Sequence, residues 1–266
     1  MMATRPSSVE VGRYGELEVV VAPDGATLGQ VAAAEAVAIL RAAIAARGEA
    51  RVIVATGNSQ LGFFHALRLH HDVAWSRVRV FHMDEYIGID ETHPASFRAF
   101  LRRELIEPLG ILHFHPIDPV EADPAATIER YAQLLARYPI DLTCMGIGEN
   151  GHLAFNDPPV ADFDDPAALK VVALDERSRA QQVGEGHFPT LDAVPTHAIT
   201  LTIPTLLRPP RALVIVPEAR KAAAVARALT GDVTTECPAS ILRRASHATL
   251  FLDVDSASLL ADAHGR

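Results

Sequence analysis

One stretch of the chain combines a glycine-rich turn with side chains suited to acid–base chemistry. The segment MGIGENGHLAFNDPP, residues 145–159, has glycines in the spacing G-x-G-x-x-G, and it also carries Asn150, His152 and Asp157. That glycine spacing is typical of dinucleotide-binding turns, but those turns lead into an uninterrupted helix. Two prolines follow here, so we reject the dinucleotide interpretation. A histidine oriented by a carboxylate is instead a common general acid–base. The alternative is a histidine that serves only the surface or the packing of a loop.

A second stretch, ATGNSQLGFF at residues 55–64, is suited to anion binding. Glycine allows a close backbone approach, hydroxyls donate hydrogen bonds, and the free N–H groups of a helix N-terminus attract anions. The residues concerned are Thr56, Gly57, Asn58 and Ser59. Phosphate is the obvious ligand, although a capped turn without a ligand would have the same composition. No G-K-[ST] sequence follows, so the stretch is not a Walker A loop.

A third stretch, FHMDEYIG at residues 81–88, places two carboxylates where an apolar run ends. Adjacent residues of an extended chain point to opposite faces, so at most one of Asp84 and Glu85 is expected in a cleft. A carboxylate held there could remove a proton next to a carbonyl group. The competing interpretation is that both are solvated loop acids.

Other polar residues indicate less. The pair Arg220 and Lys221 precedes a helical pattern, where a bound anion or ordinary surface charge would explain it equally well. The histidines outside the glycine-rich stretch, such as those of His70–His71, lack partners at a zinc-binding spacing, so we expect no metal. Cys144 and Cys237 are too few for a disulfide scaffold, and Cys144 lies in an apolar run typical of a core.

The elements that must position these residues alternate between strands and helices. Helix 27–48 is expected to begin near Thr27 and to end at Gly48. The apolar strands are expected at 17–22, 51–56, 78–83, 140–147, 171–174, 197–203, 212–216 and 247–254, and the other helices at 61–70, 96–105, 127–138 and 219–231. Such alternation predicts an α/β fold with a mainly parallel sheet covered on both faces. Ligands of such sheets bind at the carboxyl ends of strands, and each of the three stretches follows a strand.

The alternation of strands and helices is interrupted once. The stretch NDPPVADFDDPAAL, residues 156–169, is rich in proline and aspartate, and we expect an active-site lid over about residues 158–188. No repeat or composition shift marks a domain boundary. We therefore expect an N-terminal extension at residues 1–14 and a single domain at residues 15–266.

Composition excludes several classes of protein. The formal net charge of −9 disfavours nucleic-acid binding, although a small anion needs only a few local donors. The N-terminus lacks an apolar signal region, and no run approaches about 18 apolar residues. These features predict a cytoplasmic protein that binds neither nucleic acid nor membrane. A monomer and a homo-oligomer are both compatible with the sequence.

The order of the motifs resembles one family. The stretches ATGNS, MDEY followed by HPASF, GENGHLAFNDP and ARKAAAVARALTG occur in the order seen in glucosamine-6-phosphate deaminases, of the superfamily that includes 6-phosphogluconolactonases. The resemblance covers about residues 15–255. It implies a Rossmann-like three-layer α/β/α sandwich without a cofactor. The implied reaction opens the ring of a hexosamine 6-phosphate, isomerises the aldose to a ketose and releases ammonia.

The resemblance also implies roles for individual residues. Asp84 matches the base that moves a proton between C2 and C1, and His152 matches the ring-opening acid–base, with Asp157 as its supporting carboxylate. The phosphate-binding positions match Gly57, Asn58, Ser59 and Lys221. Neighbouring residues that we include in the substrate site are Thr56, Gly148, Arg179 and Gln182, and Asn150 is included in the catalytic group.

Three positions depart from the family pattern. Asn150 stands where aspartate is frequent, and Asp157 is one methylene shorter than the usual glutamate. Gln182 stands where the family has a phosphate-binding arginine, for which Arg177 or Arg179 could compensate. A further residue, Ala168, occupies the position of a basic residue of the allosteric site in some members, so we predict no such control.

These departures keep two alternatives open: a 6-phosphogluconolactonase-like hydrolase and a sugar-phosphate sensor without turnover. The DER-type and GHxASLFP motifs of the lactonase branch are absent from the sequence. A proton-shuttling base such as Asp84 is also unnecessary for lactone hydrolysis. Both points favour the deaminase.

Overall fold

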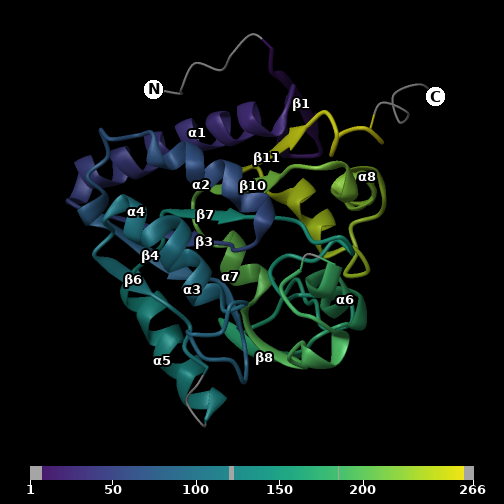
Figure 1. The fold of residues 1–266 in the computed structure, drawn as a ribbon. Coiled ribbons are helices and arrows are strands. Elements are labelled where there is room, and N and C mark those ends of the chain that lie inside the picture. The colour runs from purple at the N-terminus through teal and green to yellow at the C-terminus, as the bar shows by residue number, and fades with distance from the viewer. Residues whose placement is uncertain (1–7, 120–122, 185, 261–266) are drawn as a thin grey trace.

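A computed structural model describes residues 8–119, 123–184 and 186–260, and its centre is a sheet of eight strands (Figure 1). In spatial order the strands are β1 (Glu10–Tyr14), β2 (Leu17–Ala22), β11 (Ala248–Asp253), β10 (Ala212–Val216), β7 (Leu142–Met145), β3 (Ala50–Val54), β4 (Val78–His82) and β6 (His113–His115). Every neighbouring pair is parallel except β1 and β2. The predicted mainly parallel sheet is therefore confirmed.

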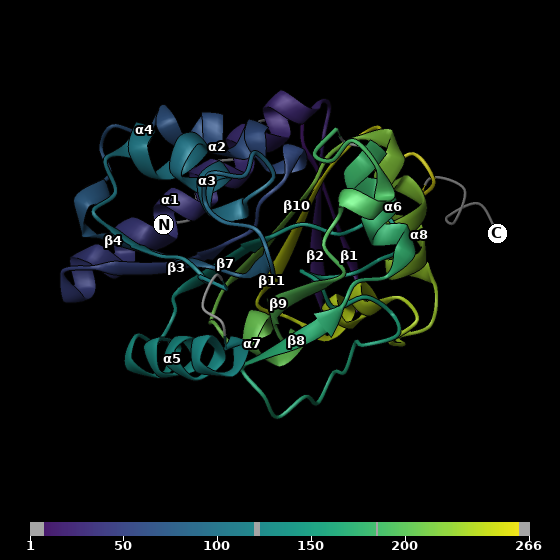
Figure 2. The same cartoon turned by 60° about the horizontal axis from the view of Figure 1, so that its bottom comes forward.

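Helices cover both faces of this sheet. On one side lie α1 (Gly25–Arg47), α2 (Leu61–Arg68), α3 (Phe97–Leu101) and α4 (Glu107–Leu109), and on the other α5 (Pro124–Arg137), α7 (Ile203–Leu207) and α8 (Ala222–Thr230) (Figure 2). Alternate residues of one strand enter different cores: Val52 and Val54 pack under α1 and α2, whereas Ile53 packs on the face of α5 and α8. Burial on both faces explains the continuous apolar runs of the strands, and the predicted three-layer sandwich is confirmed.

Helix α1 begins two residues earlier than expected. Asp24, and not Thr27, caps its N-terminus, because the Asp24 carboxylate accepts a hydrogen bond of 2.7 Å from Thr27 N. Gly48 ends the helix as predicted, in the left-handed conformation that glycine tolerates (φ 85°). Among the described residues this helix alone is long and apolar enough to cross a membrane. The sequence did not indicate this, because polar residues interrupt the apolar ones along the helix. Its apolar side packs against the sheet through residues such as Leu28 and Leu40.

A second, antiparallel sheet was not foreseen. It has three strands in the order β5 (Asp84–Tyr86), β9 (His197–Leu201) and β8 (Leu169–Ala173). The chain leaves the main sheet after β4 and enters β5 one residue later, so Asp84 begins a strand and not a loop. Tyr86, Phe155 and Phe188 form a separate apolar cluster beside this sheet. The second sheet thus gives the MDEY stretch a rigid, buried frame.

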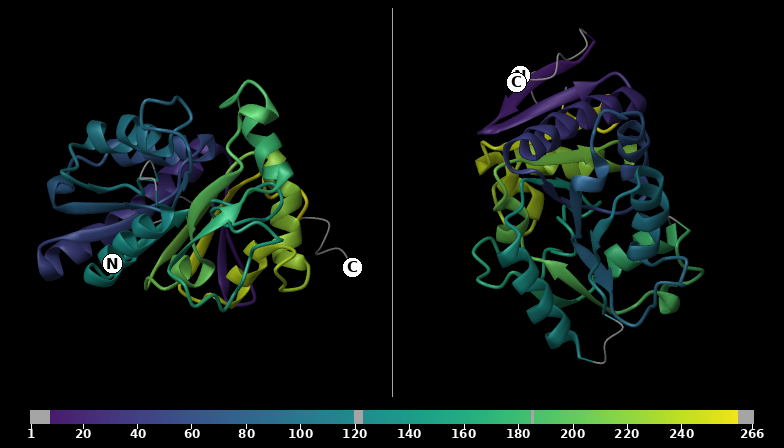
Figure 3. Two further views of the ribbon diagram at one scale, coloured as in Figure 1. Left: turned by 90° about the horizontal axis from the view of Figure 1, so that it is seen from below. Right: turned by 90° about the vertical axis from the view of Figure 1, so that its left-hand side faces the viewer.

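The predicted lid and extension both contribute regular structure. Residues 158–168 are irregular, but β8 and then α6 (Glu176–Gly184) follow within the predicted lid. Of the predicted extension, residues 10–14 form β1, which pairs with β2 at the outer edge of the main sheet (Figure 3). The helix expected over 96–105 is α3 continued by a π-helical turn, Arg102–Ile106.

Candidate active site

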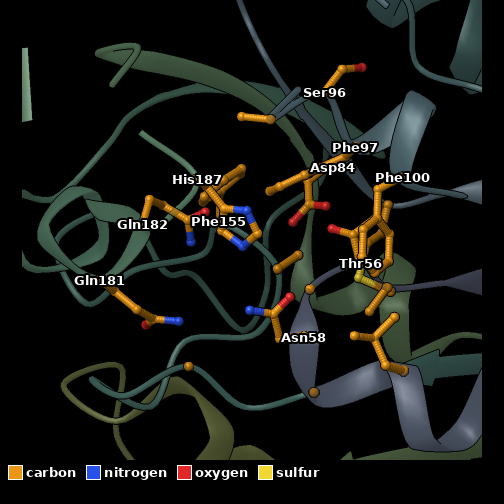
Figure 4. Close-up of a pocket in the computed structure, with 18 of the residues that line it drawn as sticks. Thr56, Asn58, Asp84, Ser96, Phe97, Phe100, Phe155, Gln181, Gln182 and His187 are labelled. Atoms are coloured by element: carbon orange, nitrogen blue, oxygen red, sulfur yellow. The ribbon is translucent and has the colours of Figure 1, made fainter. Parts of the chain in front are cut away.

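A cleft opens where strands of the main sheet end, as the topology rule predicts. Its open space measures about 1030 Å³, a volume that includes part of the solvent at its mouth. The predicted site residues that line it are Thr56, Gly57 and Asn58 after β3, Asp84 after β4, Gly148 and His152 after β7, Gln182 from α6, and Lys221 before α8. In Figure 4 the carboxylate of Asp84 points into the space between Gln182 on one side and Thr56 and Asn58 on the other.

The turn after β3 forms one end of the cleft. Gly57 has φ 101°, a conformation that residues with a Cβ rarely adopt, and it starts the short helical turn Asn58–Gln60 that leads into α2. The side chain of Gln60 donates to Ile215 O at 3.2 Å and so ties this turn to β10. Ser59 lies within this turn but is not one of the residues that line the cleft.

The two basic residues before α8 face different cavities. Lys221 is only 4% exposed and lines the cleft. Arg220 is exposed, pairs with Glu149 and Glu218, and faces a second cavity beside α6. Of the two residues, only Lys221 is therefore placed to meet an anion in the cleft.

Asp84 and Glu85 are both buried, so the interpretation as solvated loop acids is wrong. Asp84 faces the cleft, and burial together with the neighbouring charge of Glu85 raises its pKa to about 8. Glu85 faces the opposite way and accepts hydrogen bonds from Ser96 Oγ and from the backbone and side chain of Arg98. Strand alternation thus places one carboxylate in the cleft and uses the other to hold the loop before α3.

The loop after β7 brings His152 and Asp157 together. His152 Nδ1 lies 2.7 Å from Asp157 Oδ1, which also accepts from Asn150 Nδ2 at 2.8 Å. Asn150 Oδ1 in turn accepts from the backbone N–H of His152 at 2.9 Å. A carboxylate facing Nδ1 keeps the proton there and leaves Nε2 for chemistry in the cleft. The shorter arm of Asp157 therefore still reaches the imidazole.

Ser178 of α6 is a third donor to the same carboxylate oxygen, at 2.6 Å. Burial alone would raise the pKa of Asp157, but the hydrogen bonds from His152, Asn150 and Ser178 outweigh it and lower the pKa to about 2. The carboxylate is consequently a permanent negative charge behind the imidazole at neutral pH.

The glycines of this loop serve packing. The ring of His152 occupies the space where a side chain of Gly148 would lie. Gly151 has φ 92°, and a Cβ there would come 2.8 Å from Cys237 Sγ. No helix occurs in the described residues 146–168, so the loop lacks the helix that dinucleotide binding requires.

Helix α6 closes another side of the cleft. Gln181 and Gln182 line it (Figure 4). A residue that contacts the substrate phosphate must lie in the wall of the cleft, and Gln182 meets this requirement. Arg179 does not: its guanidinium donates to the carbonyls of Leu191 and Val194, at 2.7 and 3.1 Å. Arg177 faces the second cavity. The expectation that Arg179 binds substrate is therefore wrong, since the arginine anchors the far side of α6.

Several residues of the site escaped the sequence reasoning. They are the wall residues Phe97, Phe100, Phe155, Arg103 and His187, together with Ser178 behind the imidazole. Phe97 is the last residue of the HPASF motif, and an aromatic ring is a usual wall for the apolar face of a sugar. Nothing in the spacing of Ser178 indicated its contact with Asp157.

We find no metal site among the described residues, where no three His, Cys, Asp or Glu side chains gather. Two of the histidines outside the loop after β7 have other surroundings: His115 lies 2.9 Å from Arg79 Nη1, and His70 lies 3.9 Å from Asp72.

A Rossmann-like sheet whose strand ends hold a buried carboxylate, a histidine–aspartate pair and a buried lysine defines an enzyme of acid–base chemistry on a small anionic substrate. The chain belongs to the family of glucosamine-6-phosphate isomerases and 6-phosphogluconolactonases, whose family model matches residues 23–251.

Individual relatives agree with this assignment. A glucosamine-6-phosphate deaminase from Exiguobacterium sibiricum is 36% identical over 209 residues, or 79% of this chain and 81% of that protein. One from Bacillus cereus is 33% identical over 210 residues, or 79% and 78%. The solved structure of a monomeric glucosamine-6-phosphate deaminase superposes with a TM-score of 0.83 at 28% identity, covering 91% of this chain and 99% of the other. A 6-phosphogluconolactonase from Shewanella baltica shares the fold (TM-score 0.75, 19% identity, 91% and 100% covered).

Proposed function

We propose that the protein converts a hexosamine 6-phosphate and water into a ketose 6-phosphate and ammonia, with glucosamine 6-phosphate giving fructose 6-phosphate. The similarity to the deaminases from Exiguobacterium sibiricum and Bacillus cereus supports this activity. The observation that carries it is the buried Asp84, which faces the same cleft as the His152–Asp157 pair. Such a cleft offers one base for a carbon-bound proton and a second acid–base for an oxygen-bound proton.

Ring opening is the work of His152 in this proposal. Nε2 takes the proton of the O1 hydroxyl and delivers it to the ring oxygen O5 as the C1–O5 bond breaks, which leaves an aldehyde at C1. The imidazolium formed in between is stabilised by the negative charge of Asp157 at 2.7 Å. Asn150 orients the pair, since it bonds both the carboxylate and the backbone of His152.

Isomerisation is the work of Asp84. Its carboxylate removes the C2 proton while the ammonium group on C2 gives one proton to O1, which leaves a neutral enolamine across C1 and C2. The proton returned by Asp84 then adds to C1 and leaves an iminium at C2. Water then adds to C2, the C–N bond breaks, and ammonia leaves with the ketone in its place. A pKa of about 8 suits this role because the group can both take and return a proton near neutral pH. No step calls for a redox cofactor.

We propose that the phosphate binds at the turn after β3. Backbone N–H groups of Gly57, Asn58 and Ser59 and the side chain of Thr56 would donate to it, and the buried Lys221 would supply the charge. Gln182 approaches from α6 as a neutral donor. Phosphorylated sugars do not cross membranes freely, so we also propose that the enzyme acts in aminosugar metabolism in the cytoplasm.

The test measures ammonia and ketose 6-phosphate together, with glucosamine 6-phosphate and galactosamine 6-phosphate as substrates. We expect equal amounts of the two products from wild type and none from Asp84→Asn. Asp255→Asn, a change in an exposed carboxylate outside the cleft and outside the predicted lid, is the matched control.

Each alternative activity has its own signature in this experiment. The absence of ammonia from every hexosamine 6-phosphate would exclude the deaminase. Turnover of 6-phosphogluconolactone instead would establish the lactonase, and substrate binding without product would establish a sensor.

A further inference from the structure

Ser178 is the residue of the site that neither the motifs nor the reaction scheme accounts for. Ser178 is only 4% exposed, although it lies on the short surface helix α6. Its hydroxyl lies 2.6 Å from Asp157 Oδ1, 3.2 Å from His152 Nδ1 and 3.4 Å from Asn150 Nδ2. One hydroxyl from α6 therefore contacts all three polar side chains that orient the imidazole.

The geometry assigns donor and acceptor roles. The carboxylate can only accept, so the Ser178 hydroxyl donates its single proton to Asp157 Oδ1. Its oxygen is then free to accept from the neighbouring N–H groups. Asp157 Oδ2 is buried and has no hydrogen-bond partner within the described residues, so all donors act on the single oxygen that faces His152. Loss of one donor would let the carboxylate rotate away from Nδ1.

The same side of α6 also reaches the substrate cleft. Ser178, Gln181 and Gln182 are three and four residues apart and so share one side of the helix. Gln181 and Gln182 line the cleft, whereas Arg179 holds another side of α6 to Leu191 and Val194. With α6 seated over the cleft, the hydroxyl of Ser178 therefore lies on Asp157 while Gln181 and Gln182 face the substrate space.

We propose that Ser178 is a positioning residue, through which the seating of α6 over the substrate is coupled to the orientation of the His152–Asp157 pair. This inference rests on the proposed deaminase function for its consequence in turnover, but not for the contact itself. Because coupling is reciprocal, a change at Asp157 must also loosen α6.

The kinetic test uses Ser178→Ala and Ser178→Thr, with Ser258→Ala as an exposed serine control far along the chain. We expect kcat of Ser178→Ala to fall about tenfold, the equivalent of one hydrogen bond to a charged group. KM should stay within about twofold, since substrate contacts remain. Threonine keeps the hydroxyl and should restore most of kcat. A merely structural loss would affect KM and stability as well.

The second test needs no substrate. Amide hydrogen exchange of α6 is compared in wild type, Ser178→Ala and Asp157→Ala, with α5 as the internal standard. Alanine is the best helix former, so faster exchange of α6 in Ser178→Ala reports the lost contact and not a weaker helix. We expect faster exchange of α6 in both variants and unchanged exchange of α5.

The outcomes separate this inference from the proposed function. Wild-type kcat in Ser178→Ala, a kcat loss that threonine does not recover, or α6 exchange unaltered in both variants would overturn the coupling. A wild-type protein that releases no ammonia would overturn the function, and the exchange experiment would still decide the role of Ser178.

Discussion

The ring of His152 lies directly against Gly148. A Cβ atom added to Gly148 would come 2.1 Å from His152 Nε2 and 2.2 Å from Cε1, far inside van der Waals contact. Gly148 lines the cleft and has no positive φ. Glycine is therefore needed at this position because a side chain would collide with the imidazole, and not because of its backbone freedom. The glycine therefore sets how close the imidazole can lie to the strand end.

Gly148→Ala should displace the imidazole without unfolding the protein. We expect kcat to fall at least about tenfold, because a misplacement of about 1 Å is costly in a pre-organised site. Gly12→Ala is the matched control, since a Cβ at Gly12 meets nothing within 4 Å. Kinetics and thermal melts of both variants provide the measurement. Unchanged kcat in Gly148→Ala would mean that His152 is not placed by this contact.

Asp84 predicts the pH dependence of turnover. Its pKa is raised to about 8, so the carboxylate of the free enzyme gains its base form only as pH rises towards that value. We expect kcat/KM to rise with pH up to about 8 and then to level off. A profile that is flat from pH 6 to 8, recorded where thermal melts show the fold intact, would contradict the burial of the base.

The same carboxylate predicts a gain in stability when it is removed. Between its ordinary value of 3.8 and about 8, Asp84 is ionised in the unfolded chain but holds its proton in the folded one. The contribution of the group to the free energy of unfolding therefore falls as pH rises through this window. Asp84→Asn cannot ionise, so its advantage over wild type should grow from pH 5 to pH 8, on the order of a few kcal/mol. Urea unfolding at the two pH values measures it. An advantage that stays constant or shrinks would show that the carboxylate ionises freely.

Replacing Glu85 should lower the free energy of unfolding, which is opposite to the effect expected for Asp84→Asn. It is fully buried and bonds Arg98, which is itself 3% exposed and also pairs with Asp118. Glu85→Gln leaves this guanidinium with less compensating charge, and breaking a buried pair costs about 3 to 5 kcal/mol. Urea unfolding at neutral pH, with the exposed Glu107→Gln as control, provides the measurement. A loss below about 1 kcal/mol would mean that the remaining partners satisfy Arg98.

The contrast between these two neighbours shows how far sequence reasoning reaches. Strand periodicity predicted the layered α/β fold and the opposed directions of Asp84 and Glu85, because both follow from local backbone geometry. Their burial did not follow, since it depends on β5 pairing with β9, more than a hundred residues later in the chain. Arg179 and Ser178 illustrate the same limit. They are adjacent and both polar, and only the rotation of α6 about its axis decides which of them faces the site.

Replacing Gln182 by arginine should increase the affinity for the substrate. It lines the cleft, where the resemblance to the family leads us to expect a phosphate-binding arginine. Arginine would add a charged, bidentate donor that the amide cannot supply. We expect Gln182→Arg to lower KM for a hexosamine 6-phosphate about tenfold, with kcat within about twofold, because the new contact forms with substrate and transition state alike.

Two controls make this prediction specific to a phosphate contact. Gln133→Arg places the same charge on α5, away from the cleft, and should leave KM unchanged. Inorganic phosphate should inhibit Gln182→Arg more strongly than wild type, and this difference should shrink as ionic strength rises, because salt screens partly exposed charges. A KM that does not move in Gln182→Arg, with unaltered phosphate inhibition, would mean that Lys221 and the turn after β3 hold the phosphate without help from α6.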